Sequence, residues 1–425
     1  MSLAARDSKV IWHPFTPQKG AAMPIGIVKA EGAYLYDENG KKYTDGISSW
    51  WVNLHGHSHP YIAEKIASQA RILEHIIFAG FTHEPAVELA ERLLELLPGE
   101  QARIFYSDNG STSVEVALKM ALQYWYNKGE KRTKIIVLED SYHGDTFGSM
   151  SLSSRNAFTQ AFDNWLFDVI AVPVPVEGRE EEAVNAIQAA IAGGDAAVFI
   201  FEPMVQGVAG MQVMEKRALS EMVKLCQEAG VITVADEVFT GFGRTGKLFA
   251  SEFISPKPDI YCLSKGLTGG TMALGITTCN NTIYGAYVSD DRLKTFFHGH
   301  SFTANPIACT AALASLDLLM KQETFAAIQH ISNRHFDFYT RIHNHPKIKE
   351  VRHKGTILAI ELKTPAEPTS YFNNIGQTAY EYFMQRGVFL RPLGNVIYTL
   401  PPYCVSDADL DEIYAAIEGF LSLPE

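Results

Sequence analysis

The chain has 425 residues, more than one ordinary hydrophobic core organises, so we expect two structural lobes. Hydrophobic residues make up 47% of the chain and charged residues 20%, a composition typical of a globular protein. The formal net charge of -12 argues against nucleic acid or an anionic membrane as the main partner.

Targeting and redox signals are weak. We find no run approaching the roughly 18 uninterrupted apolar residues of a membrane span. The first ten residues, MSLAARDSKV, lack the apolar core of a signal peptide. The five cysteines are scattered without a CxxC pair, so neither a disulfide framework nor a thiolate zinc site is indicated. We therefore expect a cytoplasmic protein that has no membrane partner.

The middle of the chain alternates short apolar, β-branched runs with helical patterns. Six runs are expected to form buried strands: 103–107, 134–139, 168–174, 196–203, 231–237 and 259–264. Helical patterns lie between them at 113–129, 181–194 and 216–230, and the last two close on glycine. This alternation predicts an α/β fold with a mostly parallel central sheet and helices on both faces.

The C-terminal part has a different pattern. A long helical stretch begins at about Pro306, and short strands are expected near 356–362 and 388–402. We interpret this part as a smaller α+β lobe. The expected division is an N-terminal segment that joins the small lobe, a large cofactor-binding domain and a C-terminal small domain: 1–55, 56–310 and 311–425.

Ligands of a parallel sheet bind outside the carboxyl ends of its strands. Polar residues follow four of the predicted strands. The segments are SDNGST after the first, EDSYHGDTFG after the second, ADEVFTGFGRTG after the fifth and SKGLTGG after the sixth. We expect the functional site where these four segments meet.

The segment GFGRTG at 241–246 matches two nucleotide-binding patterns, GxGxxG and most of a P-loop. A P-loop needs Ser or Thr after its lysine, but Leu248 follows Lys247. A dinucleotide motif should open a long helix, whereas Pro256 and Pro258 soon interrupt the chain. Neither nucleotide hypothesis is favoured.

A lysine that forms a Schiff base and an acid that keeps a pyridine nitrogen protonated are the minimal apparatus for pyridoxal 5'-phosphate chemistry. Lys265 and Asp236, at two of the strand ends, supply that pair. Gly110 and Ser111 lead into a strong helix, whose N-terminus favours a phosphate. Tyr142 is placed to stack on the ring. Each residue alone has an ordinary structural explanation; together they favour this cofactor.

Five histidines are candidates for a metal cluster. His55, His57 and His59 occupy alternating positions, and His298 and His300 lie elsewhere. Because no carboxylate or cysteine accompanies the first three, we expect no metal site. We interpret these histidines as part of an interface and a substrate channel.

Four segments resemble the signature segments of class III pyridoxal phosphate aminotransferases, in the same order and over nearly the whole chain: DNGSTSVEVALKMALQYW, SYHGDTFG, DEVFTGFGRTG and SKGLTGG. The resemblance implies the type I pyridoxal phosphate fold and a homodimer with active sites at the subunit interface. It implies that Lys265 bonds to the cofactor and moves a proton, and that Asp236 keeps the pyridine nitrogen charged. Val238 would pack on the ring face opposite Tyr142, and Ser301 would reach the phosphate of the partner's site.

Within that class, IWHPFT, SSWWVNLHGHSHP, FFHGHSFTANP and RPLGNVIYTLPPY resemble the 7,8-diaminopelargonate synthases of biotin biosynthesis. The implied reaction is transamination of 8-amino-7-oxononanoate to 7,8-diaminononanoate by a ping-pong mechanism, with S-adenosylmethionine as amino donor. Arg391 would take the acceptor's carboxylate. The other substrate-contacting residues that this resemblance implies are Phe15, Trp50, Trp51, Tyr142, Asp145, Arg244, Lys265, Gly299 and Tyr398.

The sequence also departs from related patterns. Class III enzymes that use glutamate typically read EPIQGEAG, but this chain has Val208 in EPMVQGVAG, which argues against ornithine or 4-aminobutyrate transamination. Phe15 and His300 resemble the lysine-using branch of the family, whereas Trp50 and Trp51 favour S-adenosylmethionine. Lysine is therefore the alternative donor. Another class III ω-amino acid aminotransferase and a non-enzymatic cofactor-binding protein are further alternatives.

Overall fold

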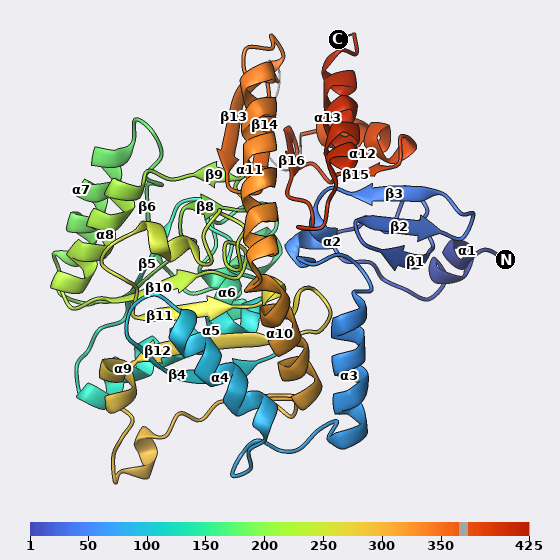
Figure 1. The fold of residues 1–425 in the computed structure, drawn as a ribbon. Helices are drawn as coiled ribbons and strands as arrows, with labels where there is room; N and C mark the ends of the chain where they lie inside the picture. The colour runs from blue at the N-terminus through green and yellow to red at the C-terminus, as the bar shows by residue number, and fades with distance from the viewer. Residues whose placement is uncertain (365–372, 425) are drawn as a thin grey trace.

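The computed structural model describes residues 1–364 and 373–424. A seven-stranded sheet in the order β4-β12-β11-β10-β7-β5-β6 forms the centre of the larger lobe (Figure 1). Its strands are β4 (Gln101–Ser107), β5 (Lys134–Leu138), β6 (Ile170–Val172), β7 (Ala196–Phe201), β10 (Ile232–Asp236), β11 (Ile260–Leu263) and β12 (Gly275–Asn280). Only β12 runs antiparallel to its neighbours among these strands. The predicted mostly parallel sheet is confirmed.

Helices cover both faces of this sheet because alternate strand residues point to opposite sides. Val137, Val198 and Val234 pack with α5 (Gly110–Lys128) in one hydrophobic cluster. Their neighbours Phe199 and Ala235 belong to a second cluster that includes α7 (Glu180–Ile191) and α8 (Lys216–Glu228). Burial on both faces explains why these strands are continuous apolar runs in the sequence.

The strand β12 is not among the strands expected from the sequence. Its six residues, GITTCN, form a short run after a glycine-rich turn, and it owes its strand conformation to pairing with β4 and β11 on either side. Shorter elements complete this lobe: α6 (Phe147–Ser151), β8 (Val205–Gln206), β9 (Gln212–Val213) and α9 (Asn281–Gly285).

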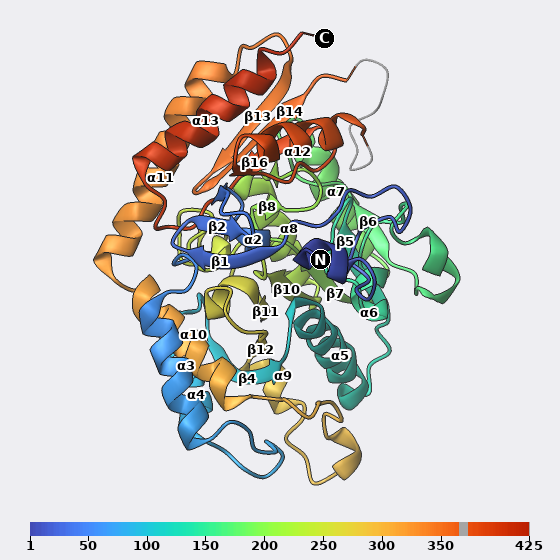
Figure 2. The same cartoon turned by 90° about the vertical axis from the view of Figure 1, so that its right-hand side faces the viewer.

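The two ends of the chain share a second sheet (Figures 1 and 2). This sheet contains β1 (Ile27–Glu31), β2 (Tyr34–Asp37), β3 (Lys42–Asp45) and β15 (Val388–Phe389), and β15 pairs in parallel with β3. Helices near it in sequence are α1 (Leu3–Asp7), α2 (Ser48–Trp51), α3 (Pro60–Ile72) and α4 (Glu84–Leu96). The boundaries 1–55, 56–310 and 311–425 stay a prediction.

The expected long helical stretch consists of two helices, α10 (Pro306–Leu319) and α11 (Gln322–Ile342). Lys321 between them has an extended backbone, so the chain turns from the buried α10 to the amphipathic α11. Beyond them lie β13 (Ile348–Lys354), β14 (Ile357–Leu362), α12 (Ile375–Gln385), β16 (Val396–Thr399) and α13 (Asp407–Leu421). Within the described residues, no helix has the length and apolarity needed to cross a membrane.

Candidate active site

The ends of β7, β10 and β11 and the loops after β4 and β5 surround a cavity of about 410 Å³. The residues predicted for the site that line it are Phe15, Trp50, Trp51, Gly110, Ser111, Tyr142, Asp236, Val238 and Lys265. This is the carboxyl edge of the parallel sheet, where a ligand site is expected. The six other predicted residues, described below, are not part of this lining: Asp145, Arg244, Gly299, Ser301, Arg391 and Tyr398.

Lys265 opens a short 3-10 helix just after β11, with a left-handed backbone (φ 47°) that is rare for a side-chain-bearing residue. Its Nζ lies 4.5 Å from the ring centroid of Trp51 and 5.7 Å from that of Phe239. Burial lowers the pKa of Lys265 from 10.5 to about 8, against the opposing effect of Asp236 and Glu202. A larger fraction of this amine than of an ordinary lysine is therefore neutral near neutral pH, as proton transfer requires.

Asp236 is the last residue of β10, and two donors orient its carboxylate. His143 Nδ1 donates to Oδ2 at 2.7 Å, and the Val238 N–H donates to Oδ1 at 3.1 Å. The His143 side chain is fully buried and lines the cavity. Sequence analysis did not assign His143 a role, although its place beside Tyr142 in SYHGD was a usable signal.

The N-terminus of α5 forms a cradle for an anion. Asn109 caps the helix, and among the described residues no acceptor binds the backbone N–H groups of Gly110 and Ser111. Ser111 Oγ accepts from the Asp145 N–H at 3.2 Å, which leaves its own proton for a ligand. A Cβ on Gly110 would lie 2.7 Å from Val238 Cγ1. The close approach of the start of α5 to the Val238 side chain therefore requires glycine.

Glu202 follows β7 and is a second site residue that sequence analysis missed. Its carboxylate accepts from the Gly207 N–H at 2.9 Å and from the Tyr142 N–H at 3.4 Å. Burial raises the pKa of Glu202 to about 7, and burial also raises the pKa of Tyr142. Glu202 thus holds the backbone that carries the predicted ring-stacking tyrosine.

Aromatic side chains make one wall of the cavity. The centroids of Phe15 and Trp50 are 5.7 Å apart, and Phe158 lies 6.1 Å from Phe15. Trp51 Nε1 donates to the hydroxyl of Tyr398 at 3.1 Å. Tyr398 is buried behind Trp51 and supports the wall from the far side.

The two predicted substrate arginines differ in their surroundings. The Arg391 guanidinium carbon lies 5.1 Å from the ring centroid of Trp50, and no carboxylate of residues 1–364 or 373–424 is within ion-pair distance of it. Arg244 is fully buried and donates to the carbonyls of Asn53 at 3.0 Å and Pro401 at 3.1 Å. Arg391 therefore places a cation beside Trp50 of the cavity wall, and no carboxylate in the described ranges pairs with it. Arg244 instead holds backbone carbonyls, and direct substrate contact by Arg244 stays a prediction.

Gly299 and Ser301 lie in the segment 296–305, which lines no part of the cavity in the same chain. Their expected role in a partner's site stays a prediction. The candidate histidines are dispersed: His298 contacts Lys119 Nζ at 3.0 Å, and His55 contacts Ser315 Oγ at 3.1 Å. In the part of the chain that the structure describes, no group of three or more potential ligands is arranged for a metal ion.

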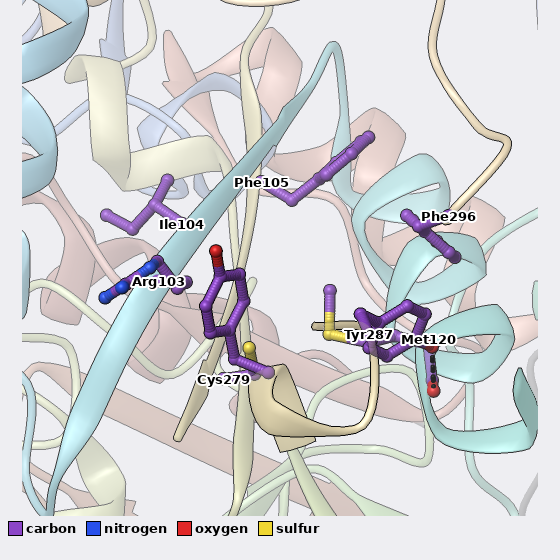
Figure 3. A pocket seen from close by; sticks show the side chains of 8 residues that line it. Arg103, Ile104, Phe105, Met120, Cys279, Tyr287 and Phe296 are labelled. Atoms are coloured by element: carbon purple, nitrogen blue, oxygen red, sulfur yellow. Dashed lines mark hydrogen bonds between the residues drawn. The ribbon is translucent and has the colours of Figure 1, made fainter. Parts of the chain in front are cut away.

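A second cavity, of about 200 Å³, lies beside β4 (Figure 3). Its walls are mainly apolar and aromatic, and Tyr287 donates there to the Met120 carbonyl at 2.7 Å. The lining residues are Arg103, Ile104, Phe105, Met120, Cys279, Tyr284, Tyr287 and Phe296. None of the residues around Lys265 reaches this cavity, so we place the chemistry in the larger one.

A family model described as aminotransferase class-III matches residues 15–421. The chain belongs to the class III aminotransferases. Within this family it is 46% identical, over 97% of this chain and 98% of the relative, to the adenosylmethionine-8-amino-7-oxononanoate aminotransferase of Synechococcus elongatus. These matches confirm the family expected from the sequence.

Solved structures of class III aminotransferases and related transaminases confirm the fold. The adenosylmethionine-8-amino-7-oxononanoate aminotransferase of Methanocaldococcus jannaschii matches with a TM-score of 0.92 and 34% identity over 98% of both chains. An omega transaminase from Pseudomonas jessenii in complex with PMP also has a TM-score of 0.92, at 26% identity over 98% of this chain and 97% of that one.

Class III aminotransferases use pyridoxal phosphate, and the residues of this cavity fit it. Lys265 would bond to the cofactor, Asp236 would hold the pyridine nitrogen, and the two unpaired N–H groups at the start of α5 would bind the phosphate. Tyr142 and Val238 are lining residues that would flank the ring. When bound, the cofactor acts as an electron sink for the carbon that loses its proton.

Proposed function

We propose that this aminotransferase converts 8-amino-7-oxononanoate into 7,8-diaminononanoate, a step of biotin biosynthesis, with S-adenosylmethionine as amino donor. The observation that carries the acceptor assignment is the Arg391 guanidinium beside the aromatic wall of Trp50, which no carboxylate of the described residues pairs with. A cation next to an apolar slot suits an acceptor that has a carboxylate at the end of an alkyl chain. The 46% identity to the adenosylmethionine-8-amino-7-oxononanoate aminotransferase of Synechococcus elongatus supports the same assignment.

Lys265 and the aromatic residues around it have separate roles in the proposed reaction. Donor and acceptor would bind in the same cavity one after the other, because both must react beside the same lysine, Lys265. The neutral Nζ of Lys265 would take a proton from the substrate carbon and deliver it to the carbon of the cofactor that receives the amino group. Trp51 and Phe239 cover that nitrogen and limit water around it.

The test supplies the loaded protein and 8-amino-7-oxononanoate with either S-adenosylmethionine or lysine, and measures 7,8-diaminononanoate by mass spectrometry. We expect S-adenosylmethionine to support product formation. Product with lysine alone would assign the alternative donor. Turnover of simple ω-amino acids or amines without any diaminononanoate would favour the ω-transaminase alternative, which the Pseudomonas jessenii structure makes the second candidate.

Replacing Arg391 with glutamine should raise KM for 8-amino-7-oxononanoate about 10- to 100-fold, the equivalent of one lost charge-assisted hydrogen-bond pair. The donor half-reaction should change little, because the variant leaves Lys265 and Asp236 untouched. Arg386→Gln is the matched control, since Arg386 also lies over an aromatic ring, that of Tyr382, but on the exposed surface. Equal KM values in R391Q and the native protein would remove Arg391 from the acceptor site.

We also propose that the protein is a homodimer, with Ser301 and Gly299 serving the partner's cavity. The segments 72–81 and 302–305 contact each other, because Asn305 Nδ2 donates to the Glu74 carbonyl and His75 packs on Phe302. Large apolar side chains of 72–81 and 293–302 are exposed: Ile72, Ile77, Phe81, Leu293, Phe297 and Phe302. Exposed large apolar side chains in this number are typical of a subunit interface. A cytoplasmic location stays a prediction.

The variant Phe297→Asp/Phe302→Asp should convert the dimer into a 47 kDa monomer and reduce activity at least tenfold, because two charges are placed on the proposed interface. Light scattering coupled to gel filtration measures the mass. Phe336→Asp is the control, since Phe336 is similarly exposed but lies on α11. A double variant that keeps both the native mass and activity would contradict the interface.

A further inference from the structure

The turn that carries Trp50 and Trp51 has a strained backbone. Ser48, Ser49 and Trp51 have φ values of 52°, 61° and 69°. Side-chain-bearing residues seldom adopt this left-handed region, and three of them within four positions are unusual. Such a conformation persists only where the surroundings hold it in place.

Asp45, at the end of β3, supplies much of that hold. Its side chain is fully buried, and one carboxylate oxygen accepts from the N–H groups of Ile47 at 3.2 Å and Ser49 at 3.0 Å. The other oxygen accepts from Ser49 Oγ at 3.0 Å and from His57 Nε2 at 2.8 Å. One carboxylate therefore binds four donors, three of which belong to the strained turn.

The orientation of His57 is itself determined. Asn53 Oδ1 accepts from the Gly56 N–H at 2.8 Å, so the amide nitrogen of Asn53 faces His57 Nδ1 at 3.2 Å. Nδ1 acts as the acceptor, and the ring proton lies on Nε2, which points to Asp45. The His57 backbone exchanges two hydrogen bonds with Gly32, at 2.7 and 3.1 Å. His57 thus joins the turn to the N-terminal sheet.

Other contacts fix the turn from the opposite side. Arg244 donates to the carbonyls of Asn53 at 3.0 Å and of Trp51 at 3.5 Å. Ser48 Oγ donates to the Leu400 carbonyl at 2.8 Å. The Trp51 ring is consequently held over Lys265, with the Nζ 4.5 Å from its centroid.

We propose that Asp45 and His57 are positioning residues that set the affinity for the acceptor's alkyl chain by holding the tryptophan wall in place. We call Asp45, Ser49, Asn53 and His57 the Asp45 clamp. The inference rests on the proposed function, because the acceptor is the substrate that needs an apolar wall. In this role His57 holds the turn, instead of binding a metal or forming an interface.

The kinetic test is Asp45→Asn, which keeps the shape of the side chain but removes an acceptor from the turn. KM for 8-amino-7-oxononanoate should rise about tenfold, and kcat should fall less than threefold because Lys265 and Asp236 are unchanged. Asp37→Asn is the matched control: Asp37 is also buried in the N-terminal sheet and accepts three hydrogen bonds, but it lies away from the cavity. Equal KM effects in the two variants would overturn the proposal.

Action through the tryptophan is tested in a Trp51→Leu background. There Asp45→Asn should raise KM by less than a further twofold, because the ring that the clamp positions is already gone. A full tenfold increase in that background would overturn the proposal. Where Asp45→Asn yields no folded protein, His57→Ala and His57→Gln take its place; alanine should raise KM, and glutamine, which keeps an N–H donor near Asp45, should restore much of the affinity.

A readout that needs no substrate separates the clamp from the proposed function. Hydrogen exchange of the peptide 46–52 should become at least tenfold faster in Asp45→Asn and stay native in Asp37→Asn, because two N–H groups of that peptide donate to Asp45. Unchanged exchange would overturn the clamp. If the native protein does not convert 8-amino-7-oxononanoate, the proposed function fails, and exchange in 46–52 alone decides whether Asp45 holds the turn.

Discussion

Replacing Lys265 with alanine is expected to lower kcat for transamination by about 10⁴-fold or more, because Lys265 is the residue proposed both to bond to the cofactor and to carry the proton. The absorption spectrum of the loaded protein should lose the band of the lysine-bound cofactor. The residual signal should be that of free or noncovalently held pyridoxal phosphate. Steady-state rates and the visible spectrum of the same preparation measure both effects.

Lys247→Ala is the control for this variant. Lys247 is an exposed lysine of the GFGRTGK segment, and its Nζ lies 4.9 Å from the ring of Phe253 rather than in the cavity. Native activity in K247A would exclude a P-loop role for that segment. Retention of more than about 1% of native activity in K265A would contradict a proton-transfer role that is worth at least 10²-fold.

The lowered pKa of Lys265 predicts the pH dependence of cofactor capture by the cofactor-free protein. A neutral amine attacks the cofactor, so capture accelerates as pH rises through the pKa of Lys265, which is about 8 rather than 10.5. At pH 7 about 10% of the amine is neutral, against roughly 0.03% for an unperturbed lysine. Stopped-flow absorbance between pH 6 and 10 should show a plateau above about pH 9. A rate still rising steeply at pH 10 would contradict the burial argument.

The second large effect is expected for Asp236→Asn. The amide keeps the shape of the side chain but removes the negative charge that would hold the pyridine nitrogen protonated. We expect kcat to fall about 10²- to 10³-fold, as on loss of one electrostatic stabiliser. Because Asp236 raises the pKa of Lys265, the midpoint of cofactor capture should move below pH 8 in D236N. Cofactor should still bind, since the start of α5 and Lys265 are intact.

Asp259→Asn is the matched control for this variant. Asp259 comes just before β11 at the opposite edge of the same sheet and accepts from Thr233 and Asn280. It should change stability but leave kcat per folded molecule native. Equal losses of kcat in D259N and D236N would show that D236N acts through the fold rather than through the cofactor.

The sequence alone determined the class of fold and predicted a candidate reacting pair, Asp236 and Lys265. Fully buried parallel strands are continuous apolar runs, which is why β5, β7, β10 and β11 were visible as such. A ligand site at the carboxyl ends of these strands follows from strand direction, so the sequence pattern predicts that Asp236 and Lys265 lie close together. The tertiary structure confirmed the fold and put nine of the predicted site residues around one cavity.

Other features depended on contacts between segments that are distant in sequence. Three features are of this kind. Strand β12 pairs with β4, and two hydrogen bonds join Glu202 to the N–H groups of Tyr142 and Gly207. Arg244 binds backbone carbonyls and does not line the cavity. Local periodicity reports whether a residue is buried, but not which residue it meets. The Asp45–His57 bond illustrates the limit: three alternating histidines suggested a metal or an interface, and only the folded turn showed a carboxylate 2.8 Å away.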